Sequence, residues 1–137
     1  MENLLNEFND LCKKIKPSET KYSFPTVRQD DGFEHLEIID DEYHLIVTER
    51  GLENSRQKTT SKDEILYWLV ASFAWGLASK FELENRIENQ DFRRLFFAKQ
   101  IEYLKIVNED WAGRKQKEFD EILAKHPFNE ELFIQKY

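Results

Sequence analysis

Hydrophobic residues recur every three or four positions over residues 2–16, which predicts an amphipathic helix. Pro17 ends this helix, because proline lacks the amide hydrogen and clashes with the preceding turn. Residues 17–32 also contain Pro25 and Gly32, so we expect mostly loop there, with a short extended piece. The apolar stripe of the helix must pack against another surface.

From residue 33 the hydrophobic period changes to two, which predicts antiparallel strands over residues 33–39 and 42–49. Asp40 and Asp41 then form the turn of the hairpin. A third strand is expected over residues 52–58, where the polar and basic side chains suit an exposed sheet edge.

The turn fixes the register of this hairpin and therefore its two faces. Glu37 is expected opposite His44 on one face of the hairpin. The residues that alternate with them lie on the other face, which is apolar. That apolar face consists of Leu36, Ile38, Tyr43, Leu45 and Val47. The second face, where His35 lies beside Ile46, is expected to be more open to water. A longer turn would exchange the two faces, because side chains alternate with a period of two.

Ser61 and Glu64 fit a capping box just before an apolar run, which is the clearest helix start in the chain. The helices predicted after this point span residues 62–88, 90–107, 109–125 and 129–136. The first of them is apolar almost all round, so its first half is expected to be central in the fold. Gly76 should weaken it by about 1 kcal/mol relative to alanine, unless a neighbouring backbone packs closely there.

A small antiparallel sheet with an N-terminal helix and three to four C-terminal helices is an α+β arrangement. The 137 residues suit a single domain over residues 1–137. Its parts are the helix 2–16, a β-ribbon over about 33–58 and a helical part over about 61–136. The aromatic content of 14% argues against disorder, although 34% of the residues are charged.

The same composition points to a cytoplasmic protein that does not enter a membrane. The longest uninterrupted apolar block, residues 65–71, is far shorter than the roughly 20 residues that span a bilayer. The first residues lack the basic start and apolar centre of a secretory signal. Cys12 has no partner for a disulfide and no surrounding ligand pattern, so we expect it to be a packing residue.

The negative charge is concentrated in one segment. Of 27 acidic residues, seven lie in residues 29–42, which contain no Lys or Arg, and the remaining 20 acids balance 20 Lys and Arg. These seven form the predicted partner-binding site, which we name the acidic ribbon: Asp30, Asp31, Glu34, Glu37, Asp40, Asp41 and Glu42. Such a field repels phosphate backbones, so nucleic acid is not an expected partner, and a basic protein surface is. A merely solubilising surface is the alternative.

Few residues suggest chemistry of another kind. His35, Glu37 and His44 form the one candidate set for a metal or for acid–base catalysis, but their spacing matches no metal motif. A small hydrolase using His44 and Glu37 therefore stays a weak alternative. With four glycines and no phosphate-binding loop, no nucleotide or other cofactor is expected.

A charged segment lies between two apolar helices and is expected to be structural. Its members are Glu82, Arg86, Asp91, Arg93 and Arg94. Glu82 and Arg86 are four residues apart and can pair on one helix face, while Asp91 lies near the next helix start. We predict an ion-pair network that fixes the corner between the helices. If it is buried, Arg86→Ala should destabilise the fold more than any change in the acidic hairpin.

Several short segments form an ordered pattern along the chain: Glu49-Arg50-Gly51, Lys58-Thr59-Thr60, Tyr67-Trp68, Ala78-Ser79, Phe81-Glu82, Arg86, Gln90-Asp91-Phe92-Arg93-Arg94, Phe97, Gln100, Trp111 and His126-Pro127-Phe128. Taken in this order, they resemble the immunity protein 63 family of bacterial polymorphic toxin systems. The resemblance covers roughly residues 40–128. It implies a small cytoplasmic, non-catalytic protein without cofactor that binds and neutralises a cognate toxin.

The resemblance carries over no contact residues, because the shared residues look structural. The acidic ribbon is the candidate surface that the charge pattern supplies instead. The competing interpretation is an interaction adaptor outside toxin systems, which would bind through the helical face around Trp68 and Trp75.

Overall fold

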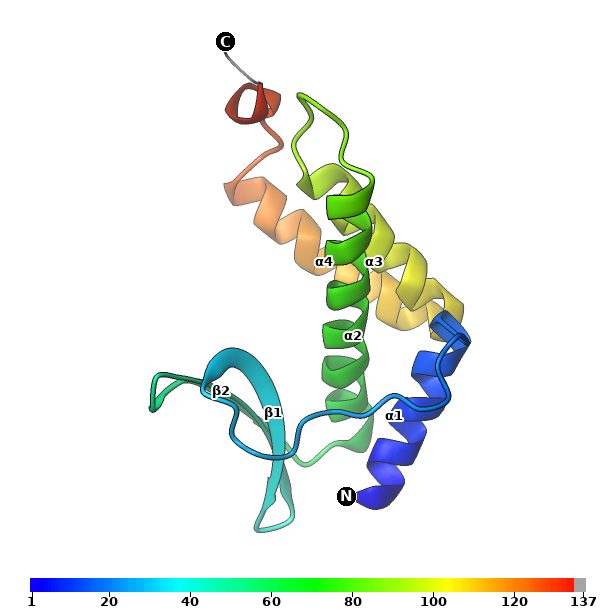
Figure 1. Cartoon of the computed structure of the whole chain (residues 1–137), viewed down its shortest axis with the longest axis vertical. Helices are drawn as coiled ribbons and strands as arrows, with labels where there is room; N and C mark the ends of the chain where they lie inside the picture. The colour runs from blue at the N-terminus through cyan, green and yellow to red at the C-terminus, as the bar shows by residue number, and fades with distance from the viewer. Residues whose placement is uncertain (135–137) are drawn as a thin grey trace. The chain divides into compact units, whose positions relative to one another are not determined.

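The computed structural model describes residues 1–134 and has an α+β fold with an N-terminal helix and C-terminal helices, as predicted (Figure 1). The elements in chain order are α1 (Glu2–Ile15), β1 (Asp31–Ile39), β2 (Glu42–Glu49), β3 (Leu52–Thr59), α2 (Lys62–Glu84), α3 (Arg93–Val107), α4 (Glu109–Lys125) and the 3-10 helix η1 (Glu130–Phe133). Residues 135 and 136 of the last predicted helix lie outside the described residues.

The chain divides into two compact units at Leu69, within α2. Unit 1 comprises Met1–Leu69 and unit 2 begins at Val70. Each unit is described by itself below, and the single domain stays a prediction. Among residues 1–134, no helix combines the length and the apolar character needed to cross a bilayer.

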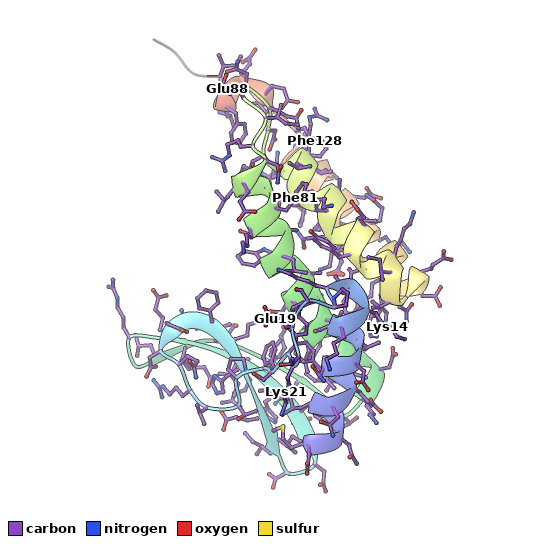
Figure 2. All side chains as sticks on the ribbon, turned by 45° about the vertical axis from the view of Figure 1, so that its right-hand side comes forward. Lys14, Glu19, Lys21, Phe81, Glu88 and Phe128 are labelled. Atoms are coloured by element: carbon purple, nitrogen blue, oxygen red, sulfur yellow. The ribbon has the colours of Figure 1, made fainter. Side chains whose placement is uncertain are left out.

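In unit 1, the apolar stripe of α1 is buried as the sequence predicts. Leu4, Phe8 and Cys12 recur every four residues and are at most 2% exposed. The segment after α1 returns to the helix, since the backbone amide of Tyr22 donates to the side-chain oxygen of Asn9 at 2.6 Å. Figure 2 labels Lys14 on α1, with Glu19 and Lys21 in this segment. Burial in apolar surroundings raises the pKa of Cys12 to about 12, which fits a packing residue.

The strand order is β1-β2-β3, with both pairs antiparallel. The register of the first pair is the predicted one, because Leu36 lies opposite Leu45 and Glu37 opposite His44. Asp40 and Asp41 both have positive φ, at 50° and 62°, as a two-residue type I′ turn requires. β3 is the predicted polar edge strand and is exposed along nearly all its length.

The expectation that one face of the hairpin is open to water is wrong. His35, His44 and Ile46 lie on that face and are only 1%, 6% and 1% exposed. Leu36 and Leu45 on the opposite face are buried as well. The middle of the sheet is therefore buried on both faces, and exposure increases toward the hairpin turn, where Ile38 and Ile39 are each 38% exposed.

Unit 2 is built on aromatic packing between the second part of α2, α3, α4 and η1. Phe97 of α3 stacks on Phe119 of α4 with ring centroids 4.0 Å apart. Phe92 and Phe133 meet edge to face at 5.7 Å, which joins the start of α3 to η1. Figure 2 labels Phe81 on α2 and Phe128 after α4, both within this unit.

The helix starts follow the local sequence. The hydroxyl of Ser61 accepts from the backbone amide of Glu64 at 3.1 Å, which is the predicted cap of α2. Asn108 caps α4 in the same way by accepting from the amide of Trp111. At Gly76, no neighbouring backbone of residues 1–134 lies within 4 Å of the place that a Cβ would occupy, so the close packing that would justify this glycine is not present.

Candidate functional site: the acidic ribbon

The acidic ribbon is presented at the two ends of β1. Asp40 and Asp41 form the exposed hairpin turn, and Glu42 begins β2 directly after it. Asp30 and Asp31 lie at the start of β1, next to the β2–β3 turn at the other end of the sheet (Figure 1). Nine residues of strand separate the two groups by roughly 30 Å. The structure thus divides the seven carboxylates between two clusters, with Glu34 and Glu37 between them on opposite faces.

The carboxylates near Asp30 are held by their own chain. Asp30 accepts from Nε of Arg28 at 2.7 Å and from the backbone amide of Gly51 at 3.3 Å. The bond from Arg28 is the main cause that lowers the pKa of Asp30 below its ordinary value. Asp31 accepts from the backbone amide of Phe33 at 3.0 Å. This end of the acidic ribbon is therefore partly neutralised and stabilises the sheet end.

The hairpin turn differs in the contacts that its carboxylates make. Within residues 1–134, Asp40 and Asp41 make no side-chain hydrogen bond or ion pair. Their backbone is fixed by the turn, so both carboxylates project from a rigid ribbon end. Together with the half-exposed Ile38 and Ile39, they form an acidic tip with an apolar base.

The two histidines near the ribbon lie on one face of the sheet with two of its carboxylates. His35 donates from Nε2 to Glu37 at 2.9 Å, so Glu37 contacts its strand neighbour and not the opposite His44. The Nδ1 of His44 accepts from Nη1 of Arg56 at 2.7 Å, because arginine can only donate. His44 Nε2 lies 3.1 Å from Oε1 of Glu42 without hydrogen-bond geometry.

This arrangement does not resemble a catalytic or metal site. Both imidazoles are more than nine-tenths buried, so neither is placed to reach a substrate. Within the part of the chain that the structure describes, no three His, Cys, Asp or Glu side chains are grouped as metal ligands. His44 instead connects β2 to β3 through Arg56, and His35 pairs with Glu37 of its own strand.

The charged corner predicted between α2 and α3 is present in unit 2, but as two separate clusters. Arg86 forms a bidentate pair with Glu82, with Nη2–Oε1 at 2.6 Å and Nε–Oε2 at 3.0 Å. Glu82 is 3% exposed, whereas the Arg86 side chain is 56% exposed. The prediction for Arg86→Ala required a buried ion-pair network, and Arg86 itself is not buried.

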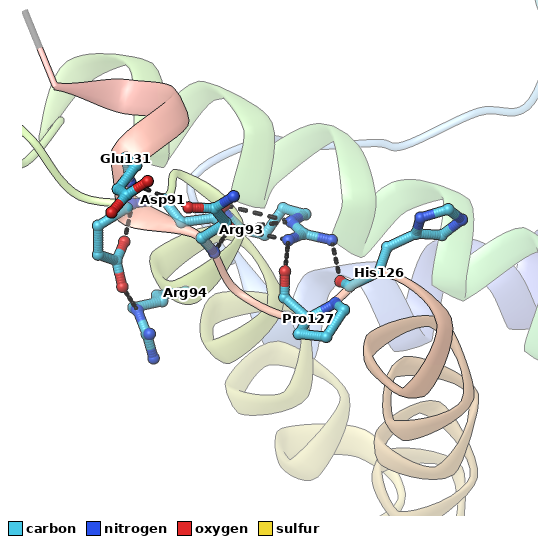
Figure 3. Close-up of polar contacts among 8 residues, drawn as sticks. Asp91, Arg93, Arg94, His126, Pro127 and Glu131 are labelled. Carbon is cyan, nitrogen blue, oxygen red and sulfur yellow. Dashed lines mark hydrogen bonds and ion pairs between the residues drawn. The ribbon is translucent and has the colours of Figure 1, made fainter.

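The second cluster centres on Asp91, which is fully buried (Figure 3). Asp91 accepts from the Arg93 guanidinium at 2.8 Å and from the backbone amide of Asn129 at 3.1 Å. Arg93 also donates to the carbonyls of His126 and Pro127, at 2.8 and 2.9 Å. This cluster ties the start of α3 to the segment after α4, and the hydrogen bond from Arg93 is the main cause that lowers the pKa of Asp91 to about 2.

The same cluster extends to Arg94 through η1. Glu130 accepts from the backbone amide of Asp91 and from Nε of Arg94. The Arg94 guanidinium lies 4.2 Å from the ring centroid of Phe128. The residues 126–130 are thus bound by the charged residues that follow α2, which fits a structural role for the motif that includes Asp91, Arg93 and Arg94.

The family of the chain follows from a comparison with models of known protein families. The model of the family described as Immunity protein 63 matches residues 40–121, more than half of the chain. The chain belongs to the immunity protein 63 family. The match confirms the family suggested by the ordered motifs. Among curated proteins and among solved structures, nothing matches the chain.

The family match covers only part of the acidic ribbon of this immunity protein. Asp40, Asp41 and Glu42 lie inside the matched range, while Asp30 to Glu37 and all of α1 lie before it. The family is generally non-catalytic.

Sequence reasoning missed two features of this immunity protein. It did not find the bonds from Arg93 to two carbonyls more than 30 residues away, since nothing local marks such partners. It also missed the contact of Arg56 with His44. The expected third strand could have suggested this contact. Its register places Arg56 opposite Ile46, and therefore on the same face as His44.

Proposed function

We propose that this member of the immunity protein 63 family binds and neutralises a cognate protein toxin in the bacterial cytoplasm, by contact and without catalysis. The single observation that carries the proposal is the family match over residues 40–121. The distribution of charge supports it, because unit 1 has 15 acids against nine Lys and Arg, whereas unit 2 has twelve against eleven. A lopsided field of this kind favours a basic partner.

We further propose that the acidic ribbon contacts the toxin and that its tip, Asp40, Asp41 and Glu42, makes the main contact. The first two are exposed and make no side-chain bond within residues 1–134, so binding a cation breaks no internal contact. Asp30 and Asp31 take part more weakly, since each already accepts a hydrogen bond. Toxins that attack nucleic acids have basic clefts, and complementary charge raises the association rate and the specificity.

The test is the association of the chain with the toxin encoded beside its gene. We expect the triple variant Asp40→Lys, Asp41→Lys, Glu42→Lys to lower the association rate constant about tenfold or more at low salt. The dependence of that rate on salt should also become shallower. Stopped-flow or biolayer measurements at several salt concentrations give both quantities, and survival of cells that express the toxin reports neutralisation.

A matched control reverses three exposed acids elsewhere: Asp10→Lys, Glu19→Lys and Glu121→Lys. It changes the net charge equally, so it separates a local contact from the overall field. If the tip variant and the control lower the rate by the same factor, the tip is not the contact surface. Absence of any binding to the adjacent toxin would reject the proposed function itself.

A further inference from the structure

Unit 2 contains an apolar groove that the proposed function does not use. It has a volume of about 290 Å³. Its apolar lining is Trp75, Leu83, Phe92 and Phe96, and its polar lining is Ser79, Glu82 and Arg86. Positions 75, 79, 83 and 86 follow one another at intervals of three or four, so the α2 side of the groove is a single helix face and its continuation. No residue of the groove belongs to the acidic ribbon.

The floor of the groove is exposed and held in shape. Trp75, Leu83 and Phe92 are 50%, 65% and 38% exposed. The ring of Phe96 meets Trp75 edge to face at 5.8 Å and lies 6.1 Å from Phe92, so both exposed rings are supported from below. Adjacent exposed aromatic and aliphatic side chains around a hollow are typical of binding surfaces and not of solvated ones.

The exposed charged group at the rim of the groove is the Arg86 guanidinium. Glu82 is 3% exposed whereas the Arg86 side chain is 56% exposed, so the guanidinium is the more accessible of the two charged groups. Arg86 uses Nε and Nη2 on Glu82, and within residues 1–134 its Nη1 has no hydrogen-bond partner. A carboxylate is the acceptor that best complements a free guanidinium edge.

We propose that this groove binds a peptide segment of a protein partner that carries an aromatic or branched aliphatic side chain next to a carboxylate. The apolar side chain lies on Trp75 and Phe92, and the carboxylate accepts from Arg86. The partner chemistry follows from the apolar floor and the accessible cation, and it differs from the basic surface expected at the acidic ribbon. The groove therefore adds a second contact surface, and its test does not depend on the proposed function.

The test uses two small probes that differ only in charge, N-acetyl-phenylalanine and N-acetyl-phenylalaninamide. Each is titrated into the ¹⁵N-labelled full chain, and the indole N–H signal of Trp75 is followed by NMR after assignment with Trp75→Phe. We expect saturable shifts at Trp75 with millimolar dissociation constants. The acid should bind about fivefold more tightly than the amide, because a single partly exposed ion pair contributes about that difference in affinity.

Variants test each part of the groove separately. Arg86→Gln should make the acid and the amide bind equally, whereas Arg86→Lys should keep a preference for the acid. Leu83→Asp should abolish the binding of both probes, and Leu52→Asp is its matched control, because Leu52 is 69% exposed in unit 1. The unshifted remainder of the spectrum shows whether each variant remains folded.

Three results would overturn the proposal. One is a Trp75 signal that does not saturate with either probe. Another is equal binding of acid and amide to the unmodified chain, which would remove Arg86 from recognition. The third is a Trp75 signal that shifts with protein concentration alone while the chain sediments as a dimer, because the groove would then hold a second copy of the chain.

Discussion

At the scale of single residues, the stability of unit 2 depends on Asp91 and Arg93 more than on the helical pair of Glu82 and Arg86. Asp91 is completely buried, and Arg93 is the cation that compensates it. Removing one member of a buried pair leaves the other charge without compensation, which is costly. Arg86 is mostly in water, so its loss exposes Glu82 to solvent and is less severe.

We predict that Asp91→Asn lowers the free energy of unfolding by about 2 kcal/mol at neutral pH. The pKa of Asp91 is about 2 in the folded chain, below its ordinary value of 3.8, because Arg93 and backbone amides bind the ionised carboxylate. Its contribution is therefore complete above about pH 4 and is lost as the pH falls toward 2. Urea unfolding from pH 7 to pH 2 measures this, and the gap between parent and variant should narrow across that range.

The control for this prediction is Asp10→Asn, which changes an exposed aspartate on α1 and should have little effect at any pH. A gap between parent and Asp91→Asn that stays constant from pH 7 to pH 2 would contradict the assigned ionisation. Equal stability at pH 7 would contradict the structural role.

At the scale of elements, the sequence predicts the hairpin well because the turn and the alternation agree. Asp40 and Asp41 tolerate positive φ, and the alternating residues on either side then allow one register only. The exposure of the second face was mispredicted, because histidine counts as polar in such patterns. Here His35 and His44 are buried, and one ring nitrogen of each is hydrogen-bonded, that of His35 to Glu37 and that of His44 to Arg56. Side-chain bonds of this kind cannot be predicted from hydropathy alone.

The candidate site was predictable to a similar degree. Charge counting found the acidic ribbon, but the pairing of Asp30 with Arg28 and Gly51 depends on the φ-positive turn that brings these residues together. Predicting the groove at Trp75 and Phe92 would require the path of the loop between α2 and α3. That path depends on the hydrogen bond between Asp91 and Asn129, 38 residues away. Local pattern carries no information about such distant partners.

The helices contain two glycines that the fold does not need, and we predict that replacing them stabilises the chain. Gly76 in α2 and Gly113 in α4 have no positive φ, and an added Cβ would meet nothing of residues 1–134 within 4 Å outside its own helix turn. Gly76→Ala and Gly113→Ala should each raise the free energy of unfolding by up to about 1 kcal/mol, because alanine loses less backbone entropy in a helix. Thermal and urea unfolding measure the gain.

A contrasting glycine provides the control for this prediction. Gly51 has φ of +82° in the β2–β3 turn, where a side chain is strained, so Gly51→Ala should destabilise the chain. A loss of stability in both helix variants would mean that the open space at their Cβ positions is needed for another reason.

At the scale of the whole molecule, the excess negative charge and the exposed aromatic groove lie in different units. Unit 1 has nearly all the excess negative charge, and unit 2 has the groove with the exposed rings of Trp75 and Phe92. The two binding proposals therefore concern partners of opposite character. A variant in one unit should leave the other binding function intact, provided that each unit remains folded.

The last prediction is that the two units unfold together as a single domain. α2 runs without interruption through the boundary, and Leu69 and Val70 on its two sides are both fully buried. Unwinding α2 in one unit would remove the helical hydrogen bonds at the start of the other. We therefore expect one cooperative transition, in which probes placed in the two units report the same midpoint in urea.

Native probes exist in both units. Cys12 in unit 1 is buried, and its pKa of about 12 keeps the thiol protonated, so a thiol reagent should modify it only after unfolding. Trp111 in unit 2 is 7% exposed, and its fluorescence becomes isolated in the variant Trp68→Phe, Trp75→Phe. Coincident midpoints for thiol labelling and fluorescence support one domain. Midpoints that differ would show that the units unfold independently, and α2 would then act as a connection between two domains.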